Sequence, residues 1–282
     1  MKLGAMKVTK FSGELVHFDK DKLEKSLQKS GADQLMVDRI LSEIEKTLYE
    51  GIPTKKIYKL AFQLLKKLSN AHAARYNLRS AVQNLGPAGF YFEKFIAKLF
   101  QQEGFQTQTN LILDGKCISH EVDVLLKKEN TVSMIECKFH GSQDAKTDVK
   151  VPLYILSRFN DLKNKDFPIF NSFFSIDNCW IVTNNRFTED AIQFGQCSGL
   201  QLLSWDFPKG NSIRNKIDAT QLYPVTCLTT LSLAEKDKLL MQEIITVQDL
   251  IQQSDWLKKI EISPQRIKNC LREVNQLCTS IH

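Results

Sequence analysis

Apolar residues recur at helical spacing through much of the first 86 residues. One stripe consists of Val37, Ile40, Leu41 and Ile44, and a second consists of Ile57, Leu60, Ala61 and Leu64. A period of three to four residues is typical of a helix with one buried face. Residues 7–18 alternate instead and turn at Ser12-Gly13, which indicates a β-hairpin. The pattern therefore predicts a small hairpin followed by a helical bundle.

Capping residues indicate where these helices begin and end. Asp19 is a good N-cap for a helix that stops at Gly31, and Thr54 is expected to cap the helix of the second stripe. A fourth helix runs through residues 71–85 and breaks at the sequence Gly-Pro-Ala-Gly, residues 86–89. Because glycine and proline interrupt helices, we place the first domain boundary there.

Beyond residue 87, helical and strand patterns alternate. Helices are predicted at 90–104, 149–163 and 188–197, and strands at 109–113, 119–126, 131–139, 179–184 and 200–205. Strands interleaved with helices indicate a mixed α/β sheet. From about residue 222 the strands stop and three helical patterns follow, the last with Ser263 as its cap and Pro264 at its first position. We therefore predict an α/β multidomain protein with domains at 1–86, 87–220 and 221–282.

Composition narrows the class of protein. The chain has 282 residues, of which 43% are hydrophobic and 25% charged, and this excludes a disordered tail, a collagen-like repeat and a small disulfide-stapled scaffold. Its apolar runs are far shorter than the ~20 residues of a membrane-spanning helix, and its amino terminus lacks the apolar stretch of a signal peptide. Seven cysteines without any CxxC motif suggest neither a zinc site nor a disulfide framework. We expect a cytoplasmic protein with no membrane partner.

The positive charge is concentrated at the amino terminus. Residues 1–86 hold 16 Lys and Arg against 9 Asp and Glu, whereas residues 87–220 hold 15 against 16 and residues 221–282 hold 7 against 7. A local positive excess is expected of a segment that contacts phosphates. A solvated helical face would give the same count, so charge alone leaves both interpretations open.

The candidate chemistry lies between residues 93 and 138. If 119–126 and 131–139 form a hairpin closed by residues 127–130, residue 123 lies opposite 134 and residue 121 opposite 136. Strand alternation then places Glu121 and Asp123 on one face with Met134, Glu136 and Lys138. Opposed carboxylates destabilise a hairpin unless a cation neutralises them, and a divalent metal ion does so. Glu93 is expected to reach the same place from its helix.

These residues resemble the PD-(D/E)xK nuclease superfamily, particularly Mrr-like restriction endonucleases and archaeal Holliday-junction resolvases. The matching elements are Phe92-Glu93, His120-Glu121-Val122-Asp123, Ile135-Glu136-Cys137-Lys138, Ile181-Val182-Thr183-Asn184, Phe187-Thr188 and Ala191. They span roughly residues 88–208. Glu-x-Lys alone is a weak signal, but the ordered set, each member on its expected element, is specific.

The resemblance implies a role for each residue. Asp123 and Glu136 would be oxygen ligands of Mg²⁺ or Mn²⁺, and Lys138 would orient the attacking water or stabilise transition-state charge. Glu93 would hold a metal-bound water or the lysine. The alternative from the residues themselves is a surface salt-bridge cluster in which Lys138 pairs with Glu121.

A second resemblance covers residues 7–80. The matching positions, in order, are Val8, Lys10, Ser12-Gly13, Phe18-Asp19, Lys22-Leu23, Thr54 and Ala73-Ala74-Arg75-Tyr76. They resemble the ATP-cone, a regulatory module of ribonucleotide reductases and of the repressors of their genes, in which a β-hairpin covers a helical bundle and clamps an adenine nucleotide. By position, Lys10 and Lys22 would contact the phosphates of ATP or dATP, and Thr54 the base or sugar. The family usually has Lys-Arg before the turn, whereas Phe11 stands here in the place of the arginine.

The last segment, residues 226–282, loosely resembles tandem helix-hairpin-helix units, with turns at 244–247 and 262–264. Such motifs bind DNA through glycine-rich turns, yet Gly210 is the last glycine of the chain, so a packing or dimerisation domain is an equal alternative.

Taken together, the resemblances imply a nucleotide-regulated, Mg²⁺-dependent DNA endonuclease of the restriction or defence type, which we expect to form homo-oligomers. The alternatives are a non-catalytic, nucleotide-responsive DNA-binding regulator and a nuclease that acts on branched DNA or RNA. The sequence retains Glu93, Asp123, Glu136 and Lys138, and this argues against the hypothesis of a non-catalytic regulator.

Overall fold

The computed structural model describes residues 6–10, 12–86 and 89–278. Their contacts divide the chain into two compact units. The first unit extends to Ser80 and also contains Cys227–Lys238 and the chain from Ser254 onward, and the second contains Ala81–Thr226 and Leu239–Gln253. The C-terminal part of the chain therefore contributes to both units. No helix in the described parts of the chain is both long and apolar enough to cross a membrane.

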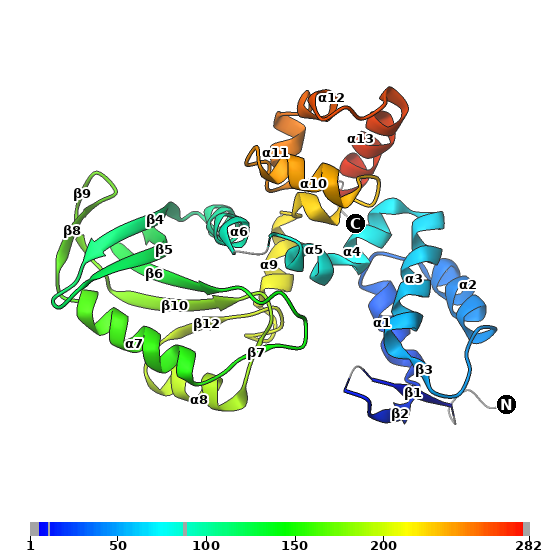
Figure 1. The fold of residues 1–282 in the computed structure, drawn as a ribbon, viewed down its shortest axis with the longest axis horizontal. Coiled ribbons are helices and arrows are strands. Elements are labelled where there is room, and N and C mark those ends of the chain that lie inside the picture. Colours follow the sequence, from blue (N-terminus) through cyan, green and yellow to red (C-terminus); the bar gives the residue numbers. More distant parts are fainter. Residues whose placement is uncertain (1–5, 11, 87–88, 279–282) are drawn as a thin grey trace. The chain divides into compact units, whose positions relative to one another are not determined.

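The first unit begins with the predicted hairpin over helices (Figure 1). Its elements are β1 (Lys7–Thr9), β2 (Leu15–His17), α1 (Lys20–Gln28), α2 (Gln34–Glu45), β3 (Ile52–Pro53), α3 (Thr54–Leu68) and α4 (Asn70–Tyr76). The strands form a sheet of order β2-β1-β3, in which β1 is antiparallel to β2 and parallel to β3. Both predicted apolar stripes face the core, since Val37, Ile40, Ile57 and Ala61 are all buried.

The predicted caps of this unit have different outcomes. Asp19 caps α1 as expected, because its Oδ1 accepts a hydrogen bond from the backbone N–H of Lys22 at 2.9 Å. Thr54 does not cap α3. It is the first helical residue, and Pro53 occupies the cap position without a side-chain hydrogen bond. The prediction of a Thr54 cap is wrong because the helix begins directly after β3, one residue earlier than the pattern indicates.

Two C-terminal helices belong to the same unit, α12 (Trp256–Lys259) and α13 (Pro264–Cys278), the latter starting at the predicted proline. α13 packs against α4, and Arg75 Nη2 donates to the carbonyls of Gln276 and Leu277 at the end of α13. Glu273 is buried and accepts hydrogen bonds from the backbone N–H groups of Thr229 and Thr230. These contacts tie residues far apart in sequence into one core.

The second unit is built on a five-stranded mixed sheet of order β12-β10-β6-β5-β4. Its strands are β4 (Gln106–Asp114), β5 (Ser119–Lys128), β6 (Thr131–Lys138), β10 (Asn178–Thr183) and β12 (Gln201–Leu203). β4, β5 and β6 form an antiparallel meander, and β10 is parallel to both β6 and β12. This is the mixed α/β sheet that the alternation of helices and strands predicts.

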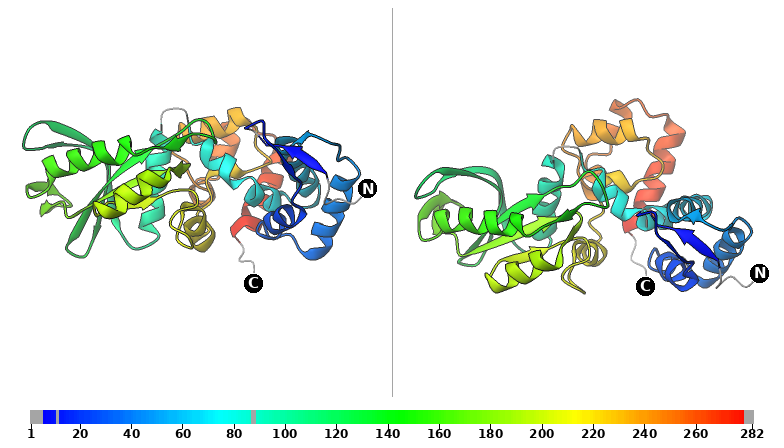
Figure 2. Two further views of the ribbon diagram at one scale, coloured as in Figure 1. Left: turned by 90° about the horizontal axis from the view of Figure 1, so that it is seen from below. Right: turned by 60° about the horizontal axis from the view of Figure 1, so that its bottom comes forward.

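Helices cover both faces of this sheet (Figure 1). α6 (Phe90–Gln101) lies on one face, where Phe100 stacks edge-on against Trp180 of β10. α7 (Lys150–Leu162) and α8 (Glu189–Cys197) lie side by side on the other face (Figure 2). Ile155 of α7 and Ala191 of α8 pack there with Met134 and other apolar residues of the strands. β6 is therefore enclosed on both sides.

The remaining elements are short. Two-stranded sheets form between β7 (Lys146–Thr147) and β11 (Arg186–Phe187) and between β8 (Asp166–Ile169) and β9 (Ser172–Ser175). α5 (Leu78–Gln83) leads into the second unit, and α9 (Ile213–Thr220), the 3-10 helix η2 (Val225–Cys227), α10 (Leu233–Leu240) and α11 (Val247–Gln252) follow the sheet. The expected fourth helix is thus divided at Asn77 into α4 and α5.

The β5–β6 hairpin has a different register from the predicted one. Its ladder pairs Leu125 with Met134, so the expected pairing of Asp123 with Met134 is wrong by two residues, and so is that of Glu121 with Glu136. Continuing the observed register brings Asp123 level with Glu136. Strand β5 continues to residue 128 and β6 starts at 131, so the turn is shorter than the sequence suggests.

Alternation along β5 is also interrupted at Asp123. Val122 and Leu125 are three positions apart, yet both belong to the core cluster on the side of α7. The β4–β5 ladder skips Asn110 and Asp123, since Thr109 pairs with Val124 and Leu111 with Val122, and Asn110 has a left-handed backbone with φ 55°. A local break in a ladder re-aims the side chains beside it. Strict alternation, on which the predicted common face of Glu121 rests, therefore does not hold here.

Candidate active site

Glu136 is the most enclosed carboxylate of the candidate site. It lies near the end of β6, and its side chain is only 6% exposed. Lys138 Nζ donates to its Oε1 at 2.7 Å, and Arg158 Nη1 of α7 donates to its Oε2. Removing an unpaired charge from water costs several kcal/mol, so a buried carboxylate needs such partners. Each oxygen of Glu136 thus has a cationic partner of its own.

Asp123 reaches the same place from β5. Its Oδ2 accepts a hydrogen bond from the backbone N–H of Cys137 at 2.7 Å, which fixes the carboxylate beside β6. Burial, and next the negative charge of Glu136, raise the pKa of Asp123 to about 7, although the Cys137 hydrogen bond opposes this shift. Burial and the neighbouring charge of Glu136 therefore destabilise the charged form of Asp123.

Glu93 joins the group from the first turn of α6. Burial raises its pKa, and the charges of Glu121 and Glu136 raise it further, while Lys138 lowers it. Gly89, with φ 85°, precedes the helix, and a Cβ at that position would lie 3.5 Å from Glu93 Oε1. Glycine adopts this left-handed backbone without strain, and the chain therefore passes close to the Glu93 carboxylate just before α6 begins.

The structure brings all four predicted residues of the nuclease site together. Glu93, Asp123 and Glu136 come from three elements, and they influence one another's charge as well as that of Lys138. Lys138 pairs with Glu136 in the described structure, not with Glu121. The surface salt-bridge alternative therefore does not describe this cluster, since Glu136 is buried. The catalytic roles of the four residues stay predictions.

The loop after β6 is held by buried polar side chains at the end of β10. Asn184 Oδ1 accepts a hydrogen bond from the backbone N–H of His140, and its Nδ2 donates to the His140 carbonyl. Thr147 Oγ1 lies 2.8 Å from His140 Nε2 and donates to Thr183 Oγ1. Thr183 and Asn184 are two of the residues that carry the nuclease resemblance. Their contacts fix the backbone that follows Lys138.

The donor set fits a divalent cation of the Mg²⁺ or Mn²⁺ kind. Such hard cations prefer carboxylate oxygens, and here Asp123 and Glu93 have raised pKa values because burial and neighbouring carboxylates disfavour their charged forms. A cation would relieve that cost. Within the described residues, no group of three or more His, Cys, Asp or Glu side chains is arranged so that it could hold a metal ion without side-chain movement. Glu136 instead faces Lys138 and Arg158.

Arg158 is the member of this site that the sequence did not reveal. It follows an apolar run in the predicted helix 149–163, and a lone arginine on a helix is expected to face solvent. Its side chain is instead 11% exposed. The position of Arg158 depends on how α7 packs on the sheet, and the local sequence pattern does not encode that packing.

The predicted nucleotide-binding residues all belong to the first unit. Lys10 and Thr54 follow Thr9 and Pro53, which pair on the parallel strands β1 and β3, so they lie at the same end of the sheet. Lys22 is in the first turn of α1, which follows β2 and so begins near the other end of β1. Lys10 Nζ forms an exposed ion pair with Glu14 at 2.9 Å. Phe11 lies outside the described residues.

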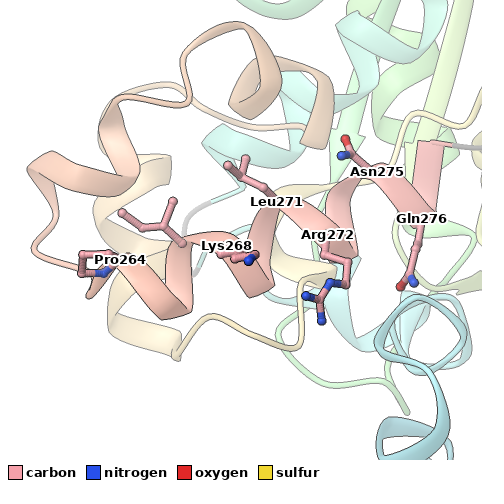
Figure 3. A pocket seen from close by; sticks show the side chains of 7 residues that line it. Pro264, Lys268, Leu271, Arg272, Asn275 and Gln276 are labelled. Carbon is pink, nitrogen blue, oxygen red and sulfur yellow. The ribbon is translucent and has the colours of Figure 1, made fainter.

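An open surface depression runs along one side of α13 (Figure 3). Its lining residues are Pro264, Ile267, Lys268, Leu271, Arg272, Asn275 and Gln276. The lining contains two cations and no carboxylate, so it offers nothing that would hold a metal ion or move a proton at neutral pH. Its lining residues include none of the four predicted nuclease-site residues.

Comparison with protein-family models divides the chain into three consecutive parts. Residues 6–81 match the ATP cone domain, residues 87–206 match the restriction endonuclease domain Mrr_cat, and residues 223–278 match the C-terminal domain of AF1548-like proteins. The first two matches confirm both resemblances that the sequence motifs carry. The helix-hairpin-helix interpretation of the last segment stays a prediction.

Individual proteins that resemble this chain share less than 30% of their residues with it. An uncharacterised protein of Archaeoglobus fulgidus is 28% identical over 183 residues, which are 64% of this chain and 99% of that protein. The crystal structure of AF1548, a protein of unknown function, is similar with a TM-score of 0.53 and 27% identity, over 67% of this chain and 97% of that one. Can2 from Sulfobacillus thermosulfidooxidans, solved with cyclic tetra-adenylate, gives a TM-score of 0.34 at 14% identity over 70% of this chain and 54% of its own. The motifs of the present chain and its matches to family models agree: it carries an ATP-cone domain followed by an Mrr-type restriction endonuclease domain.

Proposed function

We propose that the protein is a divalent-metal-dependent DNA endonuclease whose activity is regulated by an adenine nucleotide, of the restriction or defence type. The observation that carries the proposal is the group formed by Glu93, Asp123 and Glu136 around Lys138. Three carboxylates with one shared lysine are costly to keep charged in a partly buried place, and clusters with such perturbed pKa values are typical of functional sites.

The residues divide the chemistry of phosphodiester hydrolysis among them. Asp123 and Glu136 would hold the cation, which when bound acidifies a water molecule and neutralises charge on the phosphate. Lys138 Nζ donates a hydrogen bond to Glu136, and its positive charge also acts on Glu93 and Asp123; with a phosphate bound, it would stabilise a phosphate oxygen or orient the attacking water. Glu93, whose pKa is raised chiefly by burial, would hold a metal-bound water or Lys138.

The ATP-cone domain supports the regulatory half of the proposal. Lys10, Lys22 and Thr54 would contact the nucleotide, as the family resemblance implies, and the surplus of positive charge in residues 1–86 favours a phosphate ligand. DNA and an adenine nucleotide are accordingly the partners that we propose.

A covalent route connects the two units. α10 contributes Leu233–Lys238 to the first unit and its last residues to the second. The chain that follows α10 holds α6, the helix of Glu93, through the ion pairs Lys94–Glu243 and Lys98–Asp249. We infer that a nucleotide-dependent change in the first unit is passed to Glu93 along this continuous chain. Allosteric coupling is typically worth 1–3 kcal/mol, so we expect ATP or dATP to change DNA affinity by about 5–150-fold.

The decisive experiment is a cleavage assay with the full-length protein and Mg²⁺. Plasmid, methylated plasmid, single strands and four-way junctions, as DNA and as RNA, are incubated with and without ATP and dATP. Asp123→Asn is the matched inactive control because asparagine keeps an acceptor for the Cys137 N–H. Mg²⁺-dependent cleavage that Asp123→Asn abolishes supports the proposal, and the preferred substrate identifies the nucleic acid. DNA binding without any cleavage would favour the regulator instead.

A further inference from the structure

Arg158 connects α7 to both strands that carry the predicted metal ligands. Its Nη1 donates to Glu136 Oε2 on β6, and its Nη2 donates to the backbone carbonyl of Glu121 on β5. The guanidinium carbon also lies 5.7 Å from the centre of the Tyr154 ring, one turn earlier on the helix. The planar group is thus held at three points, and its orientation is determined by the fold and not by solvent.

The part of α7 that carries Arg158 is itself fixed to the start of β5. Asp161, three residues later, accepts hydrogen bonds from the backbone N–H groups of Cys117 and Ile118 and lies 2.8 Å from His120 Nε2. Hydrogen bonding to His120 holds the pKa of Asp161 well below its usual range. A Cβ on Gly115 would come within 2.1 Å of Asp161 Oδ2, so this close approach requires glycine.

These contacts divide the two oxygens of Glu136 between different partners. Oε2 is taken by Arg158, which is 11% exposed and anchored from several sides. Oε1 is taken by Lys138, whose side chain is 32% exposed and which has a flexible four-carbon stem. Of the two partners, only the lysine can move aside without disrupting the packing of α7. Oε1 is therefore the oxygen that an entering cation can reach.

We propose that Arg158 is a positioning residue that holds Oε2 of Glu136, so that Oε1 alone is presented to a divalent cation. The inference rests on the proposed metal site. Groups that orient a metal-binding carboxylate without touching the metal typically contribute 10–100-fold to metal affinity. Arg158 has this relation to Glu136, and its second hydrogen bond, to the Glu121 carbonyl, fixes the distance between the two strands.

The test measures Mn²⁺ binding to the full-length protein by calorimetry and by electron paramagnetic resonance, without DNA. Arg158→Met keeps much of the side-chain length but removes the fork, and we expect Mn²⁺ affinity to fall about 10–100-fold. Arg158→Lys keeps the charge but cannot donate to both acceptors, so its loss should be smaller but measurable. Arg186→Met is the control, because Arg186 forms an exposed ion pair with Asp206 in the same unit, and its affinity should equal that of the wild type.

A double variant separates positioning from other effects. If Arg158 acts through Glu136, Arg158→Met should cost nothing further once Glu136→Gln has removed the carboxylate. An additional tenfold loss in the double variant would overturn the inference, as would wild-type or tighter Mn²⁺ binding by Arg158→Met. If Arg158→Met does not fold, as judged by its melting temperature, Arg158→Lys decides, and wild-type affinity in that variant overturns the inference.

The same titrations distinguish this inference from the proposed function. Mn²⁺ binding that Asp123→Asn removes but Arg158→Met leaves intact would overturn the role of Arg158 alone. Absence of any Asp123-dependent Mn²⁺ binding in the wild type would overturn the metal site and the inference together.

Discussion

The two predicted sites of this protein use charge in opposite ways. In the nuclease domain, Glu136 and Arg158 are 6% and 11% exposed, and the charge of Glu136 acts on both Glu93 and Asp123. In the ATP-cone domain, Lys10 and Glu14 are 49% and 60% exposed and pair across a hairpin turn. Exposed ion pairs contribute about 0–1 kcal/mol to stability, whereas removing one partner of a buried pair costs several.

This difference predicts whether substitutions at each site affect the protein with or without a bound ligand. The buried carboxylates are already arranged by the fold, so substitutions there should affect the protein even without a ligand. The lysines of the cone are solvated, and their contribution should become visible only when a nucleotide is present. Substitutions at the two sites, and a change of pH, test this contrast.

Loss of a metal ligand should have the largest effect. We expect Asp123→Ala or Glu136→Ala to reduce Mg²⁺-dependent cleavage by about 10³-fold or more, since a metal supplies several kcal/mol and each 1.4 kcal/mol is about tenfold in rate. The rate is measured under single-turnover conditions, with circular dichroism to verify folding. Asp206→Asn, an exposed carboxylate of the same domain, should cleave normally. Near-wild-type activity of either alanine variant would mean that the site lies elsewhere.

Lys138→Ala should cause the second-largest loss of cleavage rate. Removing one positioned donor typically costs on the order of 10²-fold in rate, and Lys138 is not among the expected metal ligands. Cleavage rates and Mn²⁺ calorimetry are compared in the same preparation. A variant that loses metal affinity together with activity would instead make Lys138 a structural partner of Glu136.

Nucleotide binding should stabilise the full-length protein, and Lys10→Ala should remove most of that stabilisation. At a hundredfold excess of ATP or dATP over Kd, a single site adds about 2.7 kcal/mol, which raises the melting temperature. Without nucleotide, Lys10→Ala should melt close to the wild type because the Lys10–Glu14 pair is exposed. Lys29→Ala, another exposed lysine of this unit, is the control.

The full chain is the appropriate sample for this melting experiment. α12 and α13 belong to the same compact unit as the cone, and residues 1–86 alone would lack them. A melting temperature that neither ATP nor dATP changes would contradict nucleotide binding.

The smallest effect is a pH dependence of metal-free stability. Burial raises the pKa of Asp123 from 3.8 in the unfolded chain to about 7 in the folded protein. Between these values the folded state retains a proton that the unfolded state has released, so the free energy of unfolding falls as the pH rises. We expect the melting temperature in EDTA to fall more steeply between about pH 5 and pH 7.5 for the wild type than for Asp123→Asn, and Mg²⁺ to reverse the fall at the upper end. Parallel slopes for the two proteins would contradict this assignment.

Local patterns were sufficient for most elements of this protein. The stripes of α2 and α3 and the cap at Asp19 depend on residues within one or two helical turns, and they formed as expected. Elements that depend on contacts with distant residues were harder to predict from the sequence. The β8–β9 hairpin has no predicted counterpart, and α4 and α5 were expected as one helix.

The site shows the same division. Glu93, Asp123, Glu136 and Lys138 could be selected from their order along the chain, because each stands at a fixed place on its own element. The pairing of β5 with β6 could not, since a turn shorter by a few residues moves the register without altering either strand pattern. The left-handed Asn110 on a neighbouring strand then disturbs the alternation beside Asp123.

The two domain families, the order of most elements and the carboxylates and lysine of the candidate site could be predicted from the sequence, because local spacing and residue type encode them. Three features became visible in the folded chain alone: Arg158 of α7 faces Glu136, Asp123 hydrogen-bonds to Cys137, and the C-terminal residues divide between the two units. These features depend on contacts between residues far apart along the chain. Residues 22 or 151 positions apart meet only when separate helices and strands pack together, and that packing optimises the whole core and not any one segment.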